Sequence, residues 1–443
     1  MKPFARINLS SVLSSVALAK VDALRRVILV SSLALAAAVA GALWWGTHDC
    51  EAPDELIGPL HKKTPPPEWN AYIAYVAATN AVREWPEVGE TRPSQERKAA
   101  LVAANAEALA LMREASTRSV WCDTAFREDC LNGFFSPGDF ARMLHMMRWD
   151  LEAKIALGYR TEALDSIRAM ASFAATMRGG AESVVCWELA NSLAGNAIWG
   201  IMEFANAPCA TDDDLAVLAE FLRSLPDVQS QRYSLCMAAR RETFWWGEFA
   251  FRQIEESVQG HSILARYVYQ PNRTRRLYHD LVRRVCDMVE RGYDKEAWQG
   301  LMAEVESMNS GINRWLPNNK GRELLSAICP AWDVLAKDEA RSEFYSAAAD
   351  VVVAAERYRR KNGVRPESLS ALVPEFMPRV PDNPFGANAA LNYDAARGIV
   401  WTVGENGDFN GEKKLGTDTY GRNFKYVINL DGTPTYQPKV RNP

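Results

Sequence analysis

The sequence predicts a mainly α-helical protein with an N-terminal transmembrane helix, an irregular helical array, and a C-terminal α+β module in which a long helix packs on a small antiparallel sheet. Three observations lead to this prediction. An uncharged apolar run lies near the N-terminus, helical periodicity fills the middle, and short alternating strands follow a long helix near the end. At 443 residues the chain is long enough for two or three domains, each with its own core.

The first element is an uncharged stretch of 19 residues from Val27 to Trp45. As a helix it is about 28 Å long, close to the thickness of a bilayer's hydrocarbon core. Basic residues precede it within 1–26 and acidic residues follow it within 49–55, so we expect a cytoplasmic N-terminus. The chain is therefore predicted to be a single-pass protein of the bacterial inner membrane with its bulk in the periplasm. The alternative is a cleaved signal peptide with small-residue cleavage sites at 38–42.

Behind the span, residues 46–67 form a Pro-rich spacer, and 68–335 form the predicted exported helical domain. The segment 183–205 is apolar around most of its circumference, but its polar residues favour a helix buried between other helices over a second span. The remaining helices are expected at 68–85, 93–118, 138–178 (a hairpin turning at Gly158-Tyr159), from Thr211 onward, 229–257, 273–292 and 295–308.

Composition and motifs exclude several functions. A net charge of −4 and a pI near 5.9 argue against a nucleic-acid partner. The chain has no HExxH, no GxSxG, no phosphate loop and no dinucleotide fingerprint, so we predict no catalytic residue and no organic cofactor. The alternative is an envelope enzyme or ligand-binding protein with its site in the helical body, at a cleft that would collect His145, Arg240, Glu242 and Trp245.

A basic cluster lies on the predicted helix at 273–292. It is either a solvated or salt-bridged helix face or a site for an anionic partner. Its members are Arg273, Arg275, Arg276, Arg283 and Arg284.

The eight cysteines contain no CxxC pair, which argues against a zinc site and against thioredoxin-like redox chemistry. An even number of cysteines in an exported protein is compatible with disulfides. Cys122 and Cys130 share one short loop and are the candidates for a local bridge. Other cysteines fall within helical patterns, where they can serve as small buried hydrophobes.

The C-terminal module is predicted for 336–443. Arg341 to Asn362 has the pattern of a long helix, which Gly363 ends. A short Pro-initiated helix and a Pro-rich turn follow. Three strands are then expected around Leu391 and Tyr393, at Ile399 to Val403, and at Lys425 to Asn429.

Residues 341–430 resemble the globular half of a type II secretion major pseudopilin. The resemblance is carried by Arg357-Tyr358-Arg359, Asn362-Gly363, Pro366-Glu367-Ser368-Leu369, Leu372-Val373-Pro374, Pro381-Asp382-Asn383-Pro384 and Gly404-Glu405-Asn406-Gly407. The helical body is similar to uncharacterised planctomycete and verrucomicrobial membrane-anchored proteins. These resemblances imply a non-enzymatic structural or interaction component of the cell envelope, linked to secretion or pilus-like machinery, with the membrane and envelope proteins as partners. The chain lacks a prepilin leader joined to the long helix, so it should not polymerise as a pilin subunit.

The same resemblance implies a calcium site. Major pseudopilins bind calcium in the loop that corresponds to 404–418, and calcium takes six to eight oxygen ligands. Phe409 and Lys413-Lys414 interrupt the acidic character of this loop, so a plain connecting turn stays open as the alternative. The predicted ligands are Glu405, Asp408, Asn410 and Asp418.

Overall fold

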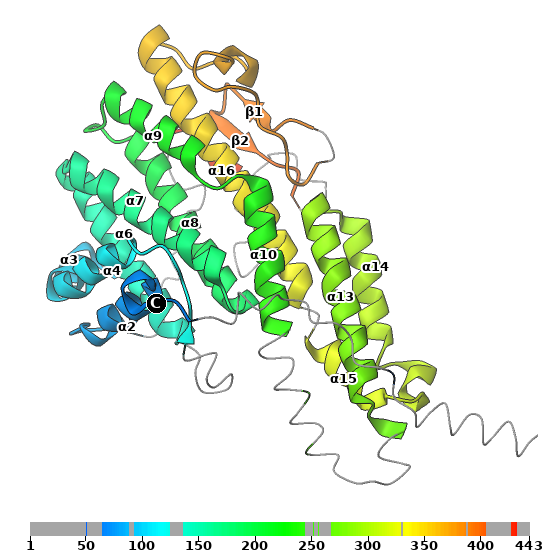
Figure 1. Cartoon of the computed structure of the whole chain (residues 1–443). Coiled ribbons are helices and arrows are strands. Elements are labelled where there is room, and N and C mark those ends of the chain that lie inside the picture. Colours follow the sequence, from blue (N-terminus) through cyan, green and yellow to red (C-terminus); the bar gives the residue numbers. More distant parts are fainter. Residues whose placement is uncertain are drawn as a thin grey trace, which may run out of the picture.

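The computed structural model describes Cys50 and residues 64–87, 93–124, 136–243, 251, 256, 267–328, 331–386, 389–404 and 427–431. It confirms a mainly helical protein with one small antiparallel sheet (Figure 1). The α-helices are α2 (Ala71–Asn80), α3 (Gln95–Ala104), α4 (Ala106–Ala115), α6 (Pro137–Leu157), α7 (Arg160–Gly180), α8 (Val184–Ala205), α9 (Asp212–Ser224), α10 (Val228–Glu242), α13 (Pro271–Arg291), α14 (Lys295–Ser307), α15 (Asn319–Ile328) and α16 (Ala331–Asn362). Three 3-10 helices, η2 (Pro67–Trp69), η4 (Gly311–Trp315) and η5 (Leu369–Leu372), and three strands, β1 (Asn392–Asp394), β2 (Ile399–Trp401) and β3 (Val427–Asn429), complete the described elements.

The predicted membrane anchor at Val27–Trp45 lies outside the described residues. Among the helices that the structure describes, none combines the length and the apolar character needed to cross a bilayer. The anchor therefore stays a prediction from the sequence.

The α6–α7 hairpin confirms the predicted turn. Ser136 caps α6 by accepting a hydrogen bond from the backbone N–H of Asp139, at 3.1 Å. Gly158 ends the helix at φ 74°, a left-handed conformation that costs glycine little because it has no Cβ. The chain then reverses into α7, so the two helices pack side by side.

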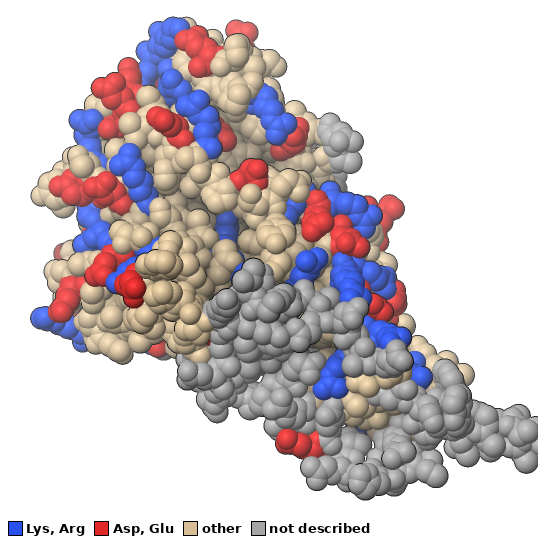
Figure 2. Space-filling view, in the orientation of Figure 1, with Lys and Arg blue, Asp and Glu red and all other residues tan. Residues whose placement is uncertain are grey.

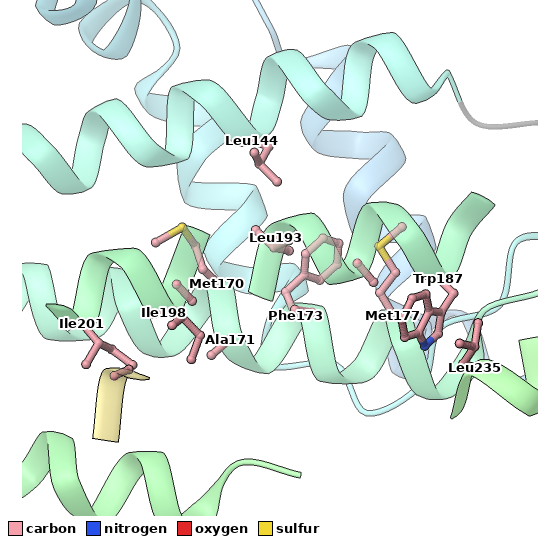
Figure 3. Close-up of a cluster of buried hydrophobic side chains, with 14 of the residues drawn as sticks. Leu144, Met170, Ala171, Phe173, Met177, Trp187, Leu193, Ile198, Ile201 and Leu235 are labelled. Atoms are coloured by element: carbon pink, nitrogen blue, oxygen red, sulfur yellow. The ribbon is translucent and has the colours of Figure 1, made fainter. Parts of the chain in front are cut away.

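Helix α8 is buried in the middle of the body, as its apolar circumference predicts. It packs against α6, α7, α10 and α16. Full burial of one large apolar side chain contributes about 1.5–3 kcal/mol, so this layer stabilises the body strongly. Figure 3 shows the side chains of this core, which include Met170, Phe173 and Met177 from α7 and Trp187, Leu193, Ile198 and Ile201 from α8.

The single helix expected at 93–118 is a wrong prediction, because the chain breaks at Asn105 into α3 and α4. The Asn105 side chain is fully buried and accepts hydrogen bonds from the backbone N–H groups of Arg83 and Glu84, at 2.9 and 3.3 Å. Its amide nitrogen donates to the carbonyls of Glu84 and Leu101, at 2.7 and 2.9 Å. The Asn105 side chain therefore links the break between α3 and α4 to the segment that follows α2.

The C-terminal sheet forms on the second half of α16. Strand β2 is central, and it pairs antiparallel with β1 (Tyr393 opposite Val400) and with β3 (Val400 opposite Ile428). All three predicted strands are thus confirmed. The Pro-initiated segment after Gly363 is a 3-10 turn, η5, rather than an α-helix, and it packs on α16.

Helix α16 belongs to both parts of the molecule. It begins at Ala331, ten residues before the predicted start at Arg341, and runs for 32 residues. Its neighbours include α8, α9 and α10 in the body and η5 and β2 in the module. Val352 on α16 lies in one continuous buried cluster with Trp187 of the body and Val400 of the sheet. The predicted boundary between 335 and 336 therefore falls inside a helix that both cores share.

Candidate functional site: a cleft between the helical body and the C-terminal module

A large cleft lies where the helical body meets the C-terminal module. Its volume is about 1580 Å³, and its walls come from α9, α10, the α13–α14 turn, α16 and the segment Pro374–Gly386. Small-molecule sites usually enclose about 300–1,000 Å³, so this cleft is larger than a typical ligand pocket. It is much larger than a second, shallower cleft of about 300 Å³ between the α13–α14 turn, α14 and the start of α16.

The wall formed by α10 and α16 is held by the ion pair of Arg232 and Glu343. The guanidinium of Arg232 donates two hydrogen bonds to the Glu343 carboxylate, at 2.7 and 3.0 Å. It also donates to the carbonyl of Glu290 at the end of α13, at 3.3 Å. The side chains of Arg232 and Glu343 are only 13% and 8% exposed, so the pair is well shielded from water. Two facing residues on α10 and α16 thus position three helices around the cleft.

Asp350 presents a carboxyl group to the cleft two turns further along α16. It is partly buried, and it makes no hydrogen bond or ion pair with the described residues. Burial raises the pKa of Asp350 to about 6, and the positive charge of Arg223 on α9 opposes that rise. Its protonation is therefore sensitive to any charged group that enters the cleft.

The module side of the cleft combines aromatic rings with charged side chains of both signs. Phe376 packs edge-on against Tyr358, with ring centroids 5.5 Å apart. The guanidinium of Arg357 and the ammonium of Lys361 lie 5.7 and 5.8 Å from the Phe376 ring centroid, within reach of a cation–π attraction. Phe385 of the module segment packs edge-on against Tyr293 of the α13–α14 turn, with ring centroids 5.4 Å apart. This wall therefore offers apolar rings with charged groups beside them.

A buried polar network lies behind the cleft. Arg178 on α7 donates to Gln231 at 3.0 Å, to Ser342 at 3.2 Å, and also to Asn191. Glu339 is 3% exposed, and both of its carboxyl oxygens lack a hydrogen-bond partner among the described residues. Burial raises the pKa of Glu339 to about 7, although the charge of Arg178 opposes this. The network connects Gln231, a lining residue, to the centre of the body.

The residues expected for an enzyme site in the body have separate surroundings. His145 stacks on Trp149 within α6, at a centroid distance of 5.9 Å, and burial lowers its pKa. Glu242, at the end of α10, accepts a hydrogen bond from the backbone N–H of Val184 at 2.7 Å. Burial raises the pKa of Glu242 to about 7. Glu242 thus binds the first backbone N–H group of α8, whereas His145 packs against a residue of its own helix, α6. Trp245 lies outside the described residues.

The predicted disulfide and calcium residues fall mostly outside the described residues. Cys122 is buried beside Asn70, whose side chain bonds the Cys122 backbone N–H and carbonyl, both at 2.9 Å. Cys130 and the loop residues Glu405, Asp408, Asn410 and Asp418 are not described. Within the described ranges, no group of three or more His, Cys, Asp or Glu side chains is placed to hold a metal ion. The bridge and the calcium site stay predictions.

The sequence carried one signal for the cleft that motif searches miss. Glu339, Glu343, Ser346 and Asp350 recur at spacings of three or four along a helix that is otherwise rich in small apolar residues. This spacing places them on one helix face. A polar stripe on a largely buried helix indicates either an internal network or a lined cavity, and here it forms both.

Comparison with models of protein families, with curated proteins and with solved structures finds no match to this chain.

Proposed function

We propose that this chain is a non-enzymatic, membrane-anchored protein of the cell envelope that holds a partner protein in the cleft between its body and its module. The observation that carries the proposal is the cleft itself, at about 1580 Å³. Its volume suits an extended polypeptide segment better than a metabolite. Export and anchoring are supported by the apolar run Val27–Trp45 and the charge asymmetry around it.

The chemistry of the walls supports a protein partner. The charges that line the cleft are mixed in sign, and the space-filling view shows Lys, Arg, Asp and Glu interspersed over this face of the molecule (Figure 2). The rings of Phe376, Tyr293 and Phe385 add apolar contact area. Aromatic anchors with arginine nearby are typical of protein–protein interfaces. The likeness of residues 341–430 to major pseudopilins supports a partner from secretion or pilus-like machinery.

A photo-crosslinking experiment tests the proposal in the full-length chain in its own membranes. A crosslinking amino acid replaces Val228, which lines the cleft and is 37% exposed. The matched control replaces Tyr233, which lies on the same helix, is 57% exposed and does not line the cleft. We expect an adduct with one envelope protein at 228 and none at 233. Filling the cleft with Ser346→Trp should abolish the adduct. Equal adducts at both positions, or an adduct that Ser346→Trp leaves unchanged, would contradict the proposal.

The second candidate is a ligand-binding protein or enzyme of the envelope, and Asp350 favours it. An unpaired carboxyl group in a cleft can bind the ammonium or guanidinium group of a small ligand. A screen of cationic ligands against the full-length chain should then find one that raises the melting temperature. Asp350→Asn should remove that rise, whereas Asp382→Asn, at the exposed rim, should not. An equal rise in both variants would eliminate Asp350 as the ligand's partner.

A further inference from the structure

One end of the molecule is built from η4 and from the starts of α13 and α15, at the lower right of Figure 1. Asn318, at φ 65°, organises this end. Its side-chain oxygen accepts hydrogen bonds from the backbone N–H of Gln270 and the hydroxyl of Thr274, both at 2.9 Å. The hydroxyl of Tyr267 donates to the carbonyl of Trp315 at 2.6 Å. The short helix η4 is therefore fastened to the start of α13.

Two large apolar side chains project from this end. Trp315 is 78% exposed and Ile312 is 76% exposed, the highest values among the large hydrophobic residues described. They lie three residues apart on η4, where side chains at i and i+3 share one face. A tryptophan beside an isoleucine on an exposed turn is poorly suited to water but well suited to a membrane interface.

The N-terminal chain meets the body at the same end. The side-chain amide of Asn272, in the first turn of α13, donates a hydrogen bond to the carbonyl of Cys50 at 2.9 Å. Cys50 follows Trp45, the last residue of the predicted span, by five residues. Five residues of extended chain reach at most about 17 Å. If Trp45 lies at the membrane surface, Asn272 is therefore held within about 20 Å of that surface.

The charges around Trp315 and Ile312 complement an anionic membrane. The first turn of α13 has no acidic residue, and Arg273, Arg275 and Arg276 lie in its first two turns. Helix α15 adds Lys320 and Arg322. Among the described residues of α15, Glu323 pairs with Lys320, at 2.7 Å. Burial lowers the pKa of Arg322, and the positive charge of Arg273 adds to this effect.

We infer that this end of the protein rests on the outer face of the membrane that holds the anchor, with Trp315 and Ile312 inserted among the lipid headgroups and the surrounding cations on lipid phosphates. Basic residues near an anionic lipid surface are attracted to it. The inference rests on the proposed anchoring, because only the anchor brings Cys50 to the membrane. It places Arg273, Arg275 and Arg276 of α13 nearest to the lipid. Further along the helix, Arg283 pairs with Asp280 and Arg284 with Glu304.

Lipid photo-crosslinking in the full-length chain tests this inference. We place p-benzoylphenylalanine at position 315 and, as a matched control, at position 364. Val364 is 61% exposed and follows the far end of α16, away from η4. Each protein is reconstituted into vesicles of phosphatidylcholine with or without phosphatidylglycerol, irradiated, and digested for mass spectrometry. We expect phospholipid adducts at 315 but not at 364, and more of them when phosphatidylglycerol is present.

The two failures are distinguishable. If the chain resists carbonate washing but position 315 yields no lipid adduct, the anchor is real and the inferred membrane surface is wrong. If carbonate releases the chain from the vesicles, the proposed anchoring is wrong and the inference falls with it. Equal lipid adducts at 315 and 364 would also refute a specific orientation.

Discussion

The ion pair of Arg232 and Glu343 offers the sharpest test of how the cleft is held together. We consider Arg232→Met, which keeps most of the side chain's volume and removes its charge. The variant leaves the Glu343 carboxylate, only 8% exposed, without the two hydrogen bonds at 2.7 and 3.0 Å. It also removes the donor to the Glu290 carbonyl on α13. The perturbation is therefore a buried, unpaired charge at the junction of three helices.

The expected cost is large and pH-dependent. Removal of one partner of a buried pair typically costs about 3–5 kcal/mol of unfolding free energy. Burial already raises the pKa of Glu343, against the opposing effect of Arg232. Without Arg232 that pKa rises further, so at low pH the folded protein can keep the carboxyl neutral. The cost of Arg232→Met should thus be small near pH 5 and grow as the pH rises. The double variant Arg232→Met/Glu343→Met should recover most of the loss, because no charge is left unpaired.

The assay is urea unfolding of the full-length chain in mild detergent, followed by circular dichroism. The matched control is Arg284→Met, which breaks a pair with the same fork geometry between α13 and α14. Both side chains of that pair are 48% exposed, so we expect a cost of at most about 1 kcal/mol. Equal costs for Arg232→Met and Arg284→Met would refute the reasoning, as would a double variant no more stable than Arg232→Met alone.

Two further predictions concern the packing and titration of the body. Gly180→Ala would place a Cβ 2.1 Å from the carbonyl oxygen of Trp121 and should lower the unfolding free energy by about 1–3 kcal/mol. The matched control is Gly179→Ala, whose Cβ meets nothing within 4 Å, so this variant should be neutral or stabilising. Equal effects of the two variants in urea unfolding would contradict this prediction. Glu339 has its pKa raised from 4.5 to about 7, so the folded state keeps a proton that the unfolded state loses, and stability should fall by about 3 kcal/mol as the pH rises through that window. Glu339→Gln should remove this decline. If the stability of the unmodified chain did not change over this pH range, Arg178 would already compensate the charge of Glu339.

Local sequence signals predicted most of the elements. Thr211 caps α9 in a capping box with Asp214. The spacing of a hydroxyl residue and an acid three positions later predicts this helix start from the sequence. Gly158 marks the α6–α7 turn by its position between two helical patterns. The strands at Tyr393 and Ile399 follow from alternation and turn residues. In each case the cause of the structure lies within a few residues of the element it shapes.

Other features depend on residues far apart in the sequence, and sequence reasoning missed them for that reason. The break at Asn105 is caused by the backbone of Arg83 and Glu84, about 20 residues earlier. The cleft depends on Arg232 meeting Glu343, which are 111 residues apart. The periodic acids of α16 were visible, but nothing local identifies which of them an arginine would neutralise.

Helix α16 has a consequence for how this protein can be divided, in the laboratory or by gene rearrangement. One side of the helix completes the body against α8, and its later turns carry the sheet. A cut at its start would expose apolar residues such as Phe344 and Val351 that the body now covers. A cut at its end would leave Val400 and Ile428 without a support. The module therefore cannot be removed by itself. To transfer the sheet to another protein, one would have to transfer α16 with it, and also a surface on which α16 can pack.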